Sequence, residues 1–486
     1  MEKKLTLRPF SRLEGDLEIE VRFKKEEIVD CCCSGIMFRG FENLLTGRDL
    51  MDALVFVCRI CGVCGVSQSV AAAKALRKIF GIDIPVNGYL ATGIVLATEI
   101  LLNQFTHFYI LFTPDLVNPR YSGHPLYPEV VKRFSPFSGL SYRKMVEARK
   151  ALLTIMGIFA GKWPNTLALH PGGTTKPINK SEKIRCMGSL KEFQDFVESV
   201  FLGCEIEQWL EKRSFEEIEL WLKKKEAVES DLGIFLLFGR EIGLPELGKG
   251  PVRFLSSAGF ELPEGKSWYK EGFYDGNLHP LDTGKIREDH TFSWLENGEH
   301  HPFEGSTRPD IDKKTAYSWS KSPRYEGKVV EVGPLARLVI NQEPLVTSLF
   351  SRWGANVYTR VLARMQEAIK LIPRISFWIE QIDWEKPFYH KPDKVVNKKA
   401  RALVEAARGM LGHWIKVENG KIKNYQIITP TTWNFSPRDS DGNPGACEQA
   451  LVGTRLKNPE QPLEIFHIIR SYDPCLFCSV HMIEVR

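Results

Sequence analysis

Helical spacing of apolar residues dominates the chain. Between the cysteine at position 64 and Gly81, apolar residues recur at helical spacing, with Ser67 as a candidate cap: Val70, Ala71, Ala73, Leu76 and Phe80. Longer patterns predict helices over about 87–113, 143–161, 190–226 and 344–372, and a shorter pattern predicts one over about 397–409. Their broad apolar faces are typical of helices that lie against one another in a bundle.

Strand character is confined to other parts of the chain. Residues 17–23 alternate between apolar and charged side chains, which predicts a half-buried strand, and a second strand precedes the three cysteines at 31–33. Residues 245–330 are rich in Gly, Pro, Asp and aromatic residues and predict strands and loops, and a short strand covers 414–417. We therefore expect a mainly α protein with β additions (α+β), in which a bundle of long helices carries peripheral strands, and a single domain over residues 1–486.

Composition changes this picture little but excludes several classes of protein. The 65 basic and 60 acidic residues leave a net charge of +5 without basic clusters, which argues against a nucleic-acid partner. The apolar stretch 89–112 contains Glu99, Asn103, Gln104 and His107, so it predicts a buried helix and no membrane span. The first residues lack an apolar stretch suited to a signal peptide. We therefore expect a cytoplasmic chain, with export alongside a signal-carrying partner as the alternative.

Cysteine carries the candidate chemistry. The chain has 11 cysteines, and an odd number in a long chain argues against a disulfide scaffold and for a reducing compartment or metal ligation. Two pairs lie near opposite ends: Cys61-Gly62-Val63-Cys64 and Cys475-Leu476-Phe477-Cys478. Each pair puts two thiols close enough to bind one metal ion, so the pairs would form a four-sulfur site if they met.

The spacing of the two pairs leaves three interpretations open. They are a structural zinc site, which usually takes its cysteines from one local module, a catalytic transition-metal site, and separate redox or buried thiols. The flanking residues favour a catalytic metal, because Arg59 and Asp473 place charges beside the thiols and His481 offers a further ligand. A soft four-thiolate site selects nickel, iron, zinc or copper over hard ions.

Further motifs accompany the cysteine pairs in order along the chain. They are Ser-Arg-Leu-Glu-Gly (11–15), Phe-Arg-Gly-Phe-Glu (38–42), Arg-Ile-Cys-Gly-Val-Cys (59–64), His-Phe-Tyr (107–109), Glu-Val-Gly-Pro-Leu-Ala-Arg (331–337), Glu-Ala-Ala-Arg-Gly (405–409), Pro-Thr-Thr-Trp-Asn (430–434) and Asp-Pro-Cys-Leu-Phe-Cys-Ser-Val-His (473–481). With these motifs, the chain resembles the large, catalytic subunit of nickel–iron hydrogenases over nearly its whole length. A related subunit of respiratory complex I shares that fold but lacks these cysteines.

The resemblance implies a metal centre held by the two pairs. Nickel would be bound terminally by Cys61 and Cys475. Cys64 and Cys478 would bridge the nickel to an iron that carries carbon monoxide and two cyanides.

The resemblance also implies roles for five residues around that centre. Arg408 would lie over the open side of the metals and contact one cyanide, Thr431 would contact the other, and Leu411 would lie beside the carbon monoxide. Glu14 would accept the proton that leaves a cysteine thiolate, and Asp473 would pair with Arg408 or its neighbours. A carboxylate is suited to this role because protons leave an active site in short hydrogen-bonded steps.

A magnesium ion is the third implied metal. Glu42, His481 and the backbone carbonyl of Ile427 would bind it, with Glu331 farther out. Family members are usually made with a longer C-terminal extension that a protease removes after the histidine, whereas only residues 482–486 follow His481 here.

The resemblance implies reversible heterolytic oxidation of dihydrogen to protons and electrons. The chain has no further cysteine set suited to a cluster, so the electrons would pass to an iron–sulfur small subunit in a heterodimer or higher oligomer. Maturation proteins would insert the nickel and the iron–cyanide group. The alternatives are a hydrogen-sensing regulatory subunit and, outside the family, a non-redox protein with a structural four-cysteine zinc site.

Four positions depart from the family pattern. Gln68 stands where histidine is usual, Asn103-Gln104 stand where Asp-His is usual, and Ala407 stands where proline is usual. Gln68 and the Ala-Arg-Gly sequence are similar to the branch that contains cytoplasmic uptake and hydrogen-sensing members. We expect altered charge and proton traffic around the metals, because an aspartate is missing.

Overall fold

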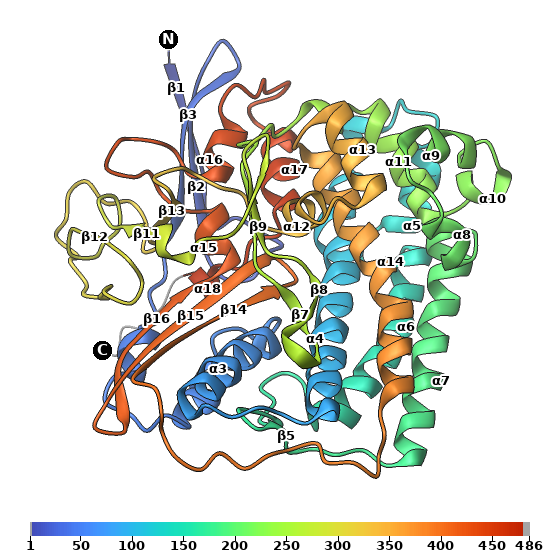
Figure 1. Ribbon diagram of the computed structural model, residues 1–486. Helices are drawn as coiled ribbons and strands as arrows, with labels where there is room; N and C mark the ends of the chain where they lie inside the picture. Colours follow the sequence, from blue (N-terminus) through green and yellow to red (C-terminus); the bar gives the residue numbers. More distant parts are fainter. Residues whose placement is uncertain (1, 480–486) are drawn as a thin grey trace.

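A bundle of long helices forms one side of the molecule (Figure 1). The computed structural model describes residues 2–479, with the backbone alone for 478 and 479. Four helices run side by side: α4 (Val86–Thr106), α6 (Leu140–Ala160), α7 (Lys180–Phe196) and α14 (Val357–Gln381). The mainly helical architecture with added strands agrees with the sequence prediction.

Helix α4 is the centre of this bundle. It contacts both α14 and α6, and it continues into a π-helical turn, η1 (His107–Phe112), and a 3-10 turn, η2 (Thr113–Asp115). The stretch Val86–Asp115 is long and apolar enough to cross a membrane, but 83% of its most apolar window is buried inside the protein. This burial agrees with the expectation of a core helix.

Two predicted helices are interrupted in the structure. The pattern over 190–226 covers the end of α7, a π-helical turn η4 (Val197–Leu202) and three short helices, α8 (Ile206–Leu210), α9 (Phe215–Trp221) and α10 (Lys225–Val228). Gly203 ends η4 at φ 66°, where a Cβ would lie 2.3 Å from the carbonyl oxygen of Glu226. The pattern over 344–372 covers α13 (Pro344–Trp353) and the first part of α14, which begins after the capping residue Asn356.

The helix predicted over 397–409 is wrong. This segment is strand β14 (Lys399–Ala406), which pairs antiparallel with β15 (Gly409–Glu418), and β15 pairs with β16 (Lys421–Ile428). Its residues favour helices in isolation, but tertiary context overrides propensity because β14 lies against helix α3 (Gly65–Phe80). The strand predicted over 414–417 lies within β15.

The N-terminal segment forms a second three-stranded sheet, in the order β1-β2-β3. Strands β2 (Leu17–Lys24) and β3 (Glu27–Gly35) agree with the predicted strands, and β1 (Glu2–Leu7) pairs with β2. Helix α16 (Ala446–Leu451) lies against β3.

The region 245–330 contains short strands and long loops, as predicted. One sheet joins β10 (Leu278–His279), β9 (Gly272–Tyr274) and β6 (Phe254–Ser256). A second joins β12 (Glu299–His300), β11 (Ile286–Asp289) and β13 (Ser322–Tyr325). Strand β7 (Gly259–Glu261) pairs with β8 (Ser267–Tyr269).

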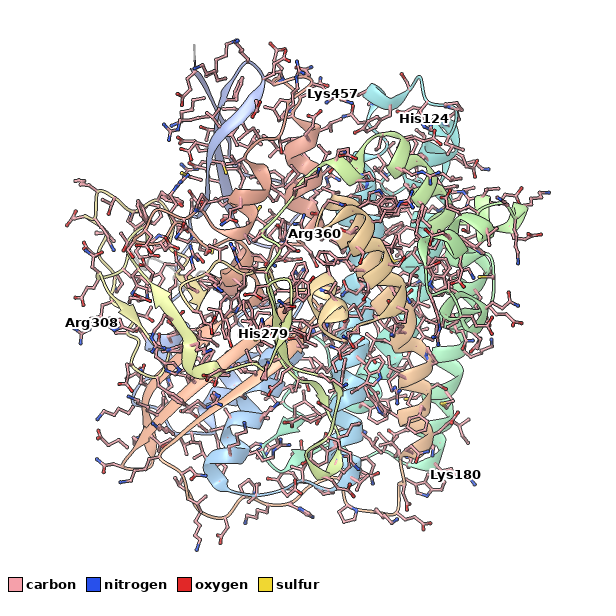
Figure 2. All side chains as sticks on the ribbon, turned by 45° about the horizontal axis from the view of Figure 1, so that its top comes forward. His124, Lys180, His279, Arg308, Arg360 and Lys457 are labelled. Carbon is pink, nitrogen blue, oxygen red and sulfur yellow. The ribbon has the colours of Figure 1, made fainter. Side chains whose placement is uncertain are left out.

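The two ends of the chain meet in the interior. The backbone N–H of Leu476 donates to the carbonyl oxygen of Glu14 at 2.7 Å, and Glu14 and Cys475 form a parallel β-bridge. Near this junction, α17 (Leu463–Ser471) contacts α14, and α18 (Leu476–Ser479) contacts α15 (Pro430–Asn434). Figure 2 labels Arg360 of α14 near the middle of the view; this residue is only 3% exposed and donates to the hydroxyl of Tyr472 at 2.7 Å.

Candidate metal centre

Three cysteine sulfurs from opposite ends of the chain converge in the interior. Cys61 lies in the turn before α3, Cys64 is the N-cap residue of α3, and Cys475 directly precedes α18. Their Sγ atoms all lie within 4.8 Å of one another, and the sulfurs of Cys61 and Cys475 are 3.2 Å apart. Cys478 belongs to α18, and its side chain lies outside the described residues. Within residues 2–479, this is the one group of three such atoms at metal-binding distance.

This donor set fits a soft metal. All three cysteines are buried, and Cys64 is the N-cap residue at the positive end of helix α3. Buried thiolates select transition metals over magnesium or calcium. A large helical core needs no zinc staple, so a structural role alone does not explain why both chain ends meet here.

A small cavity lies beside the sulfurs. Its lining residues come from five segments: Cys64, Ser67, Gln68, Ala406, Arg408, Leu411, Pro430, Thr431 and Cys475. The Nη1 of Arg408 is buried without a hydrogen-bond partner in the described part of the chain. The hydroxyl oxygen of Thr431 accepts the backbone N–H of Cys475 at 3.0 Å, which leaves the hydroxyl proton for another acceptor.

Arg408 owes its orientation to Asp473. Its Nε donates to the backbone carbonyl oxygen of Asp473 at 2.7 Å, and its Nη2 lies 3.1 Å from the Asp473 carboxylate. Burial opposes the charge of Arg408, but Asp473 and the three cysteine sulfurs outweigh burial and hold the pKa of Arg408 well above its ordinary value. Arg408 therefore stays charged at the edge of the cavity.

The two unusual residues of α4 belong to the same network. Asn103 donates to Asp473 Oδ2 at 2.7 Å, and Arg364 Nη1 lies 3.3 Å from the same oxygen. Gln104 donates to the carbonyl oxygen of Ala407 at 3.1 Å, next to Arg408. Burial alone would raise the pKa of Asp473, but Arg408, His107 and Arg364 lower it below its ordinary value. A neutral amide at 103 thus leaves Asp473 as the carboxylate that the two arginines share.

Glu14 lies beside this network in the N-terminal segment. Its backbone pairs with Cys475, and burial and the Cys61 sulfur raise the pKa of Glu14, whereas Arg408 lowers it. The net direction is upward. A carboxylate with a raised pKa binds a proton more readily than an ordinary one, which suits a proton acceptor next to the sulfurs.

The predicted magnesium ligands lie in a separate charged cluster. Glu42, in α1 (Phe41–Leu45), accepts the backbone N–H of Ile427 at 2.7 Å and the ammonium of Lys321 at 3.0 Å. Glu288 lies 3.6 Å from the same ammonium, and its two carboxylate oxygens have no hydrogen-bond partner among the described residues. His481 lies outside the described residues.

Glu331 has a different partner from the one expected. Both of its carboxylate oxygens lie 2.8 Å from the guanidinium of Arg360, and the hydroxyl of Tyr472 donates to one of them. Arg360 therefore neutralises Glu331 directly.

Sequence reasoning missed Lys321, Glu288 and Arg364. Lys321 and Glu288 lie in the region read as strands and loops, and Arg364 lies inside a helical pattern. No local pattern in the sequence marks Lys321, because its burial appears only in the fold.

Ser67 does not cap α3. It lies in the first turn of the helix, after the N-cap residue Cys64, whose side chain makes no capping hydrogen bond. The capping acceptor comes instead from Glu99 of α4, which accepts the backbone N–H groups of Val66 and Ser67. Glu99 lies far from α3 in the sequence, so no local pattern predicts this cap.

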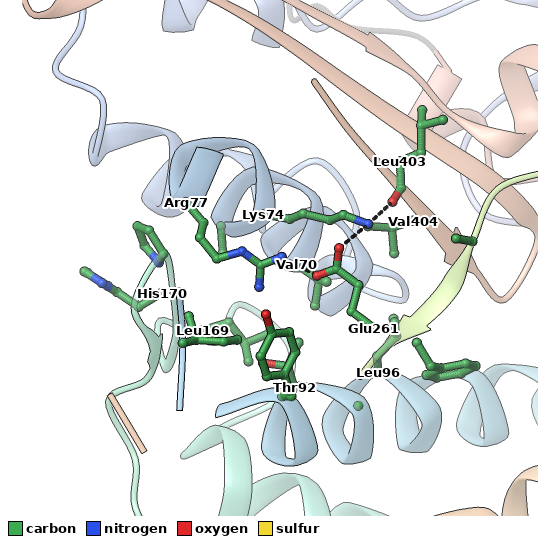
Figure 3. A pocket seen from close by; sticks show the side chains of 17 residues that line it. Val70, Lys74, Arg77, Thr92, Leu96, Leu169, His170, Glu261, Leu403 and Val404 are labelled. Atoms are coloured by element: carbon green, nitrogen blue, oxygen red, sulfur yellow. Dashed lines mark hydrogen bonds and ion pairs between the residues drawn. The ribbon is translucent and has the colours of Figure 1, made fainter. Parts of the chain in front are cut away.

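A second cavity, of about 570 Å³, lies between α3, α4, β7 and β14 (Figure 3). In Figure 3, Lys74 lies between the carbonyl oxygen of Leu403, at 3.0 Å, and Glu261, at 2.8 Å. Arg77 pairs with Glu261 as well. No cysteine lines this cavity, so it lies apart from the metal centre. Its charged groups pair with one another, and these contacts hold α3 against β14.

The fold brings three cysteine sulfurs from the two ends of the chain to one buried site whose donors suit a soft metal. Comparison with known families gives the class: residues 39–123 and 118–481 match the nickel-dependent hydrogenase model, and the chain belongs to that family. It is a hydrogenase large subunit, an oxidoreductase that acts on dihydrogen, and the family implies nickel and iron. The expectation from the sequence motifs is confirmed.

Known relatives align with this chain over nearly the whole length of both proteins. The chain is 30% identical to the large subunit of a periplasmic [NiFeSe] hydrogenase from Desulfomicrobium baculatum, over 99% of this chain and 96% of that protein. It is 29% identical to an uptake hydrogenase large subunit from Rhodobacter capsulatus, over 100% and 96% respectively. The solved structure of the reduced Ni-Fe-Se hydrogenase from D. vulgaris Hildenborough superposes with a TM-score of 0.84 at 29% identity, over 99% of this chain and 100% of that one.

Proposed function

We propose that this chain oxidises dihydrogen reversibly and heterolytically at a nickel–iron centre bound by Cys61, Cys64, Cys475 and Cys478. The observation that carries the proposal is the convergence of three of these sulfurs, within 4.8 Å, beside a cavity that Arg408 and Thr431 line. In the proposed arrangement Cys61 and Cys475 would bind nickel, and Cys64 and Cys478 would bind both nickel and iron.

The cavity also fits the small ligands of the iron, one carbon monoxide and two cyanides. Cyanide is a hydrogen-bond acceptor, and the unpartnered Nη1 of Arg408 and the hydroxyl of Thr431 are donors that line the cavity. Leu411 offers an apolar contact for carbon monoxide. The chemistry of these side chains supports the three assignments.

When bound, the metals supply the polarisation that makes dihydrogen acidic and take up the electrons. The side chains of this chain then handle the proton. Arg408, held by Asp473, keeps a fixed positive charge at the edge of the cavity. Glu14 accepts the proton at its carboxylate, because burial raises its pKa above the ordinary value.

We also propose a magnesium ion bound by Glu42, His481 and the carbonyl oxygen of Ile427, with Glu331 farther out. Carboxylate and carbonyl oxygens are the ligands that magnesium prefers, and Glu288 brings a second carboxylate without a hydrogen-bond partner among the described residues. The ammonium of Lys321 donates to Oε1 of Glu42. This ammonium must therefore withdraw before magnesium can bind that oxygen.

The electrons require a second protein. Cysteines outside the metal centre do not gather into a cluster site within residues 2–479, which supports an iron–sulfur small subunit as partner, in a heterodimer or higher oligomer. Maturation proteins for nickel and iron–cyanide insertion belong to the same proposal.

We further propose that residues 1–486 form one domain and that the chain resides in the cytoplasm, where buried thiols such as Cys33 and Cys447 stay reduced.

A hydrogen-sensing role is the second candidate function. Gln68, which lines the cavity, accepts a hydrogen bond at its Oε1 from His413 Nε2 at 2.8 Å, and Asn103 replaces the usual aspartate. These neutral side chains stand where ionisable groups could carry protons. Slower proton transfer would suit a sensor subunit with a low turnover rate. The turnover rate with an artificial electron acceptor distinguishes an enzyme from a sensor.

Glu14→Gln in the assembled complex tests the proton role. Glutamine keeps the size of the side chain but cannot accept the proton, so we expect dihydrogen oxidation to fall about 100-fold or more while nickel content stays the same. The two quantities are measured on one preparation. Full activity in the variant would refute the Glu14 route and leave the metal assignment intact.

A further inference from the structure

Glu99 is a buried carboxylate near the metal cavity that no step above uses. It projects from α4, is 1% exposed, and meets the first turn of α3. Its Oε2 accepts the backbone N–H of Val66 at 2.8 Å. Its Oε1 accepts both the backbone N–H of Ser67, at 2.9 Å, and the Ser67 hydroxyl, at 2.7 Å. Trp163 Nε1 donates to Oε2 at 3.3 Å.

We propose that Glu99 is a second proton-accepting carboxylate of the metal cavity, reached through the hydroxyl of Ser67. This inference rests on the proposed function. Ser67 belongs to the lining of the cavity together with Cys64 and Arg408, and on its other side it is hydrogen-bonded to Glu99. A 2.7 Å oxygen–oxygen distance is within the range for direct proton transfer.

The transfer balances without a co-reactant. A proton from the cavity binds the Ser67 oxygen while the existing hydroxyl proton leaves for Glu99 Oε1. One O–H bond forms on Ser67 and one breaks there, and a new O–H bond forms on Glu99. The cavity loses one proton, the serine is restored, and the glutamate becomes a neutral carboxylic acid.

The surroundings of Glu99 make both of its charge states accessible. Four hydrogen bonds and the positive end of α3 favour the carboxylate, whereas burial favours the neutral acid. Burial prevails and raises the pKa of Glu99 to about 7. Proton exchange at neutral pH therefore requires little driving force.

Charged groups do not fix the state of Glu99. Burial and hydrogen bonds to uncharged donors account for its pKa in the described part of the chain, and its α4 neighbour Asn103 is neutral. Arg149 of α6 lies 5.5 Å from the centroid of the Trp163 ring, and its Nε donates to the hydroxyl of Thr106. The first turn of α3 contributes backbone N–H groups and the Ser67 hydroxyl.

A purely structural role is the competing explanation. Cys64 makes no side-chain cap for α3, and Glu99 supplies the missing acceptors. A cap of this kind does not change its protonation when the metals change their oxidation state. A proton-accepting group does.

Infrared difference spectroscopy on the assembled large and small subunits separates the two roles. Spectra of the dihydrogen-reduced minus the oxidised complex are compared in the region of the protonated carboxyl stretch. We expect a carboxyl band in the natural protein that is lost in Glu99→Gln. Glu448→Gln is the matched control, because Glu448 is equally buried with a pKa of about 7 but lies on α16. Absence of the band, or its survival in Glu99→Gln, would overturn the proposal.

Ser67→Ala tests the route while it keeps the carboxylate. We expect the same band at equilibrium, but its appearance after rapid mixing with dihydrogen should slow about tenfold or more. An unchanged rate would overturn transfer through Ser67, and this variant also decides the matter if Glu99→Gln does not assemble. The bands of metal-bound carbon monoxide and cyanide appear in the same spectra: their absence counts against the proposed function, and their presence without a carboxyl response counts against Glu99 alone.

Discussion

At the scale of single residues, one carboxylate determines how Arg408 meets the metal cavity. Asp473 accepts from both Nε and Nη2 of Arg408, so Nη1 is left for a ligand in the cavity. Only a guanidinium can make these contacts with a single planar group, whereas lysine offers one ammonium.

Arg408→Lys should therefore keep the metals but lose activity. We expect dihydrogen oxidation to fall about 100-fold, the usual effect of removing a preorganised donor, at unchanged nickel content. Arg374→Lys is the matched control, because Arg374 lies on α14 over the rings of Trp268 and Phe377. An activity within about twofold of the control would show that Nη1 of Arg408 has no part in the reaction.

Glu448 gives a second residue-scale prediction, on stability. Burial raises its pKa to about 7 although the backbone N–H of Cys33, the backbone N–H of Gly445 and the hydroxyl of Tyr317 all bond to it. The folded protein thus holds a proton that the unfolded chain releases at lower pH. Stability from this group is complete below about pH 4.5 and is lost as the pH rises to about 7.

Glu448→Gln should remove that dependence. We expect the melting temperature of the natural protein to fall more between about pH 5 and about pH 8 than that of the variant, by an amount that corresponds to about 2–3 kcal/mol at most. Thermal unfolding of both proteins across this range gives the comparison. Parallel curves would mean that Glu448 is already ionised in the folded protein.

At the scale of elements, the sequence patterns predicted secondary structure well where a helix or strand buries one face more than the other. The alternation in β2 and the helical spacing of α3, α4 and α6 all appear in the structure. The segment 397–409 failed because Ala, Leu, Glu and Arg favour helices locally, whereas β14 is buried under α3 and paired with β15. Breaks such as Gly203 were missed because they depend on close contacts with distant backbone.

The β14–β15 turn supports the metal site directly. It contains Arg408 and then Gly409, whose φ is 126° and whose added Cβ would lie 2.6 Å from the backbone nitrogen of Gly333. Other residues rarely adopt this conformation, and the backbone contact leaves no room for a side chain.

Gly409→Ala should therefore displace the turn that carries Arg408. We expect a loss of about 2–4 kcal/mol in stability and a matching fall in nickel content per chain. Gly420→Ala is the control at the next turn, where φ is 74° but no atom lies within 4 Å of the added Cβ. Equal effects of the two substitutions would show that the contact with Gly333 is unimportant.

At the scale of the whole molecule, the metal centre links both ends of the chain. The cysteines were identifiable from the sequence because their flanking motifs are specific, and three of their sulfurs do converge. Asn103 was recognisable as a departure from the family pattern, but its hydrogen bond to Asp473 was not predicted. Arg364 and Glu99 reach the site from separate helices, and no local spacing connects them to it. We expect metal insertion to follow most of folding, because the site forms only when both ends lie against the helical core.

The central claim is that these cysteines hold nickel and iron with carbon monoxide and cyanide ligands. Infrared spectroscopy of the purified complex, combined with metal analysis of the same sample, tests it most directly. The account predicts bands of metal-bound carbon monoxide and cyanide together with one nickel and one iron per chain. Zinc alone, without those bands, would contradict it.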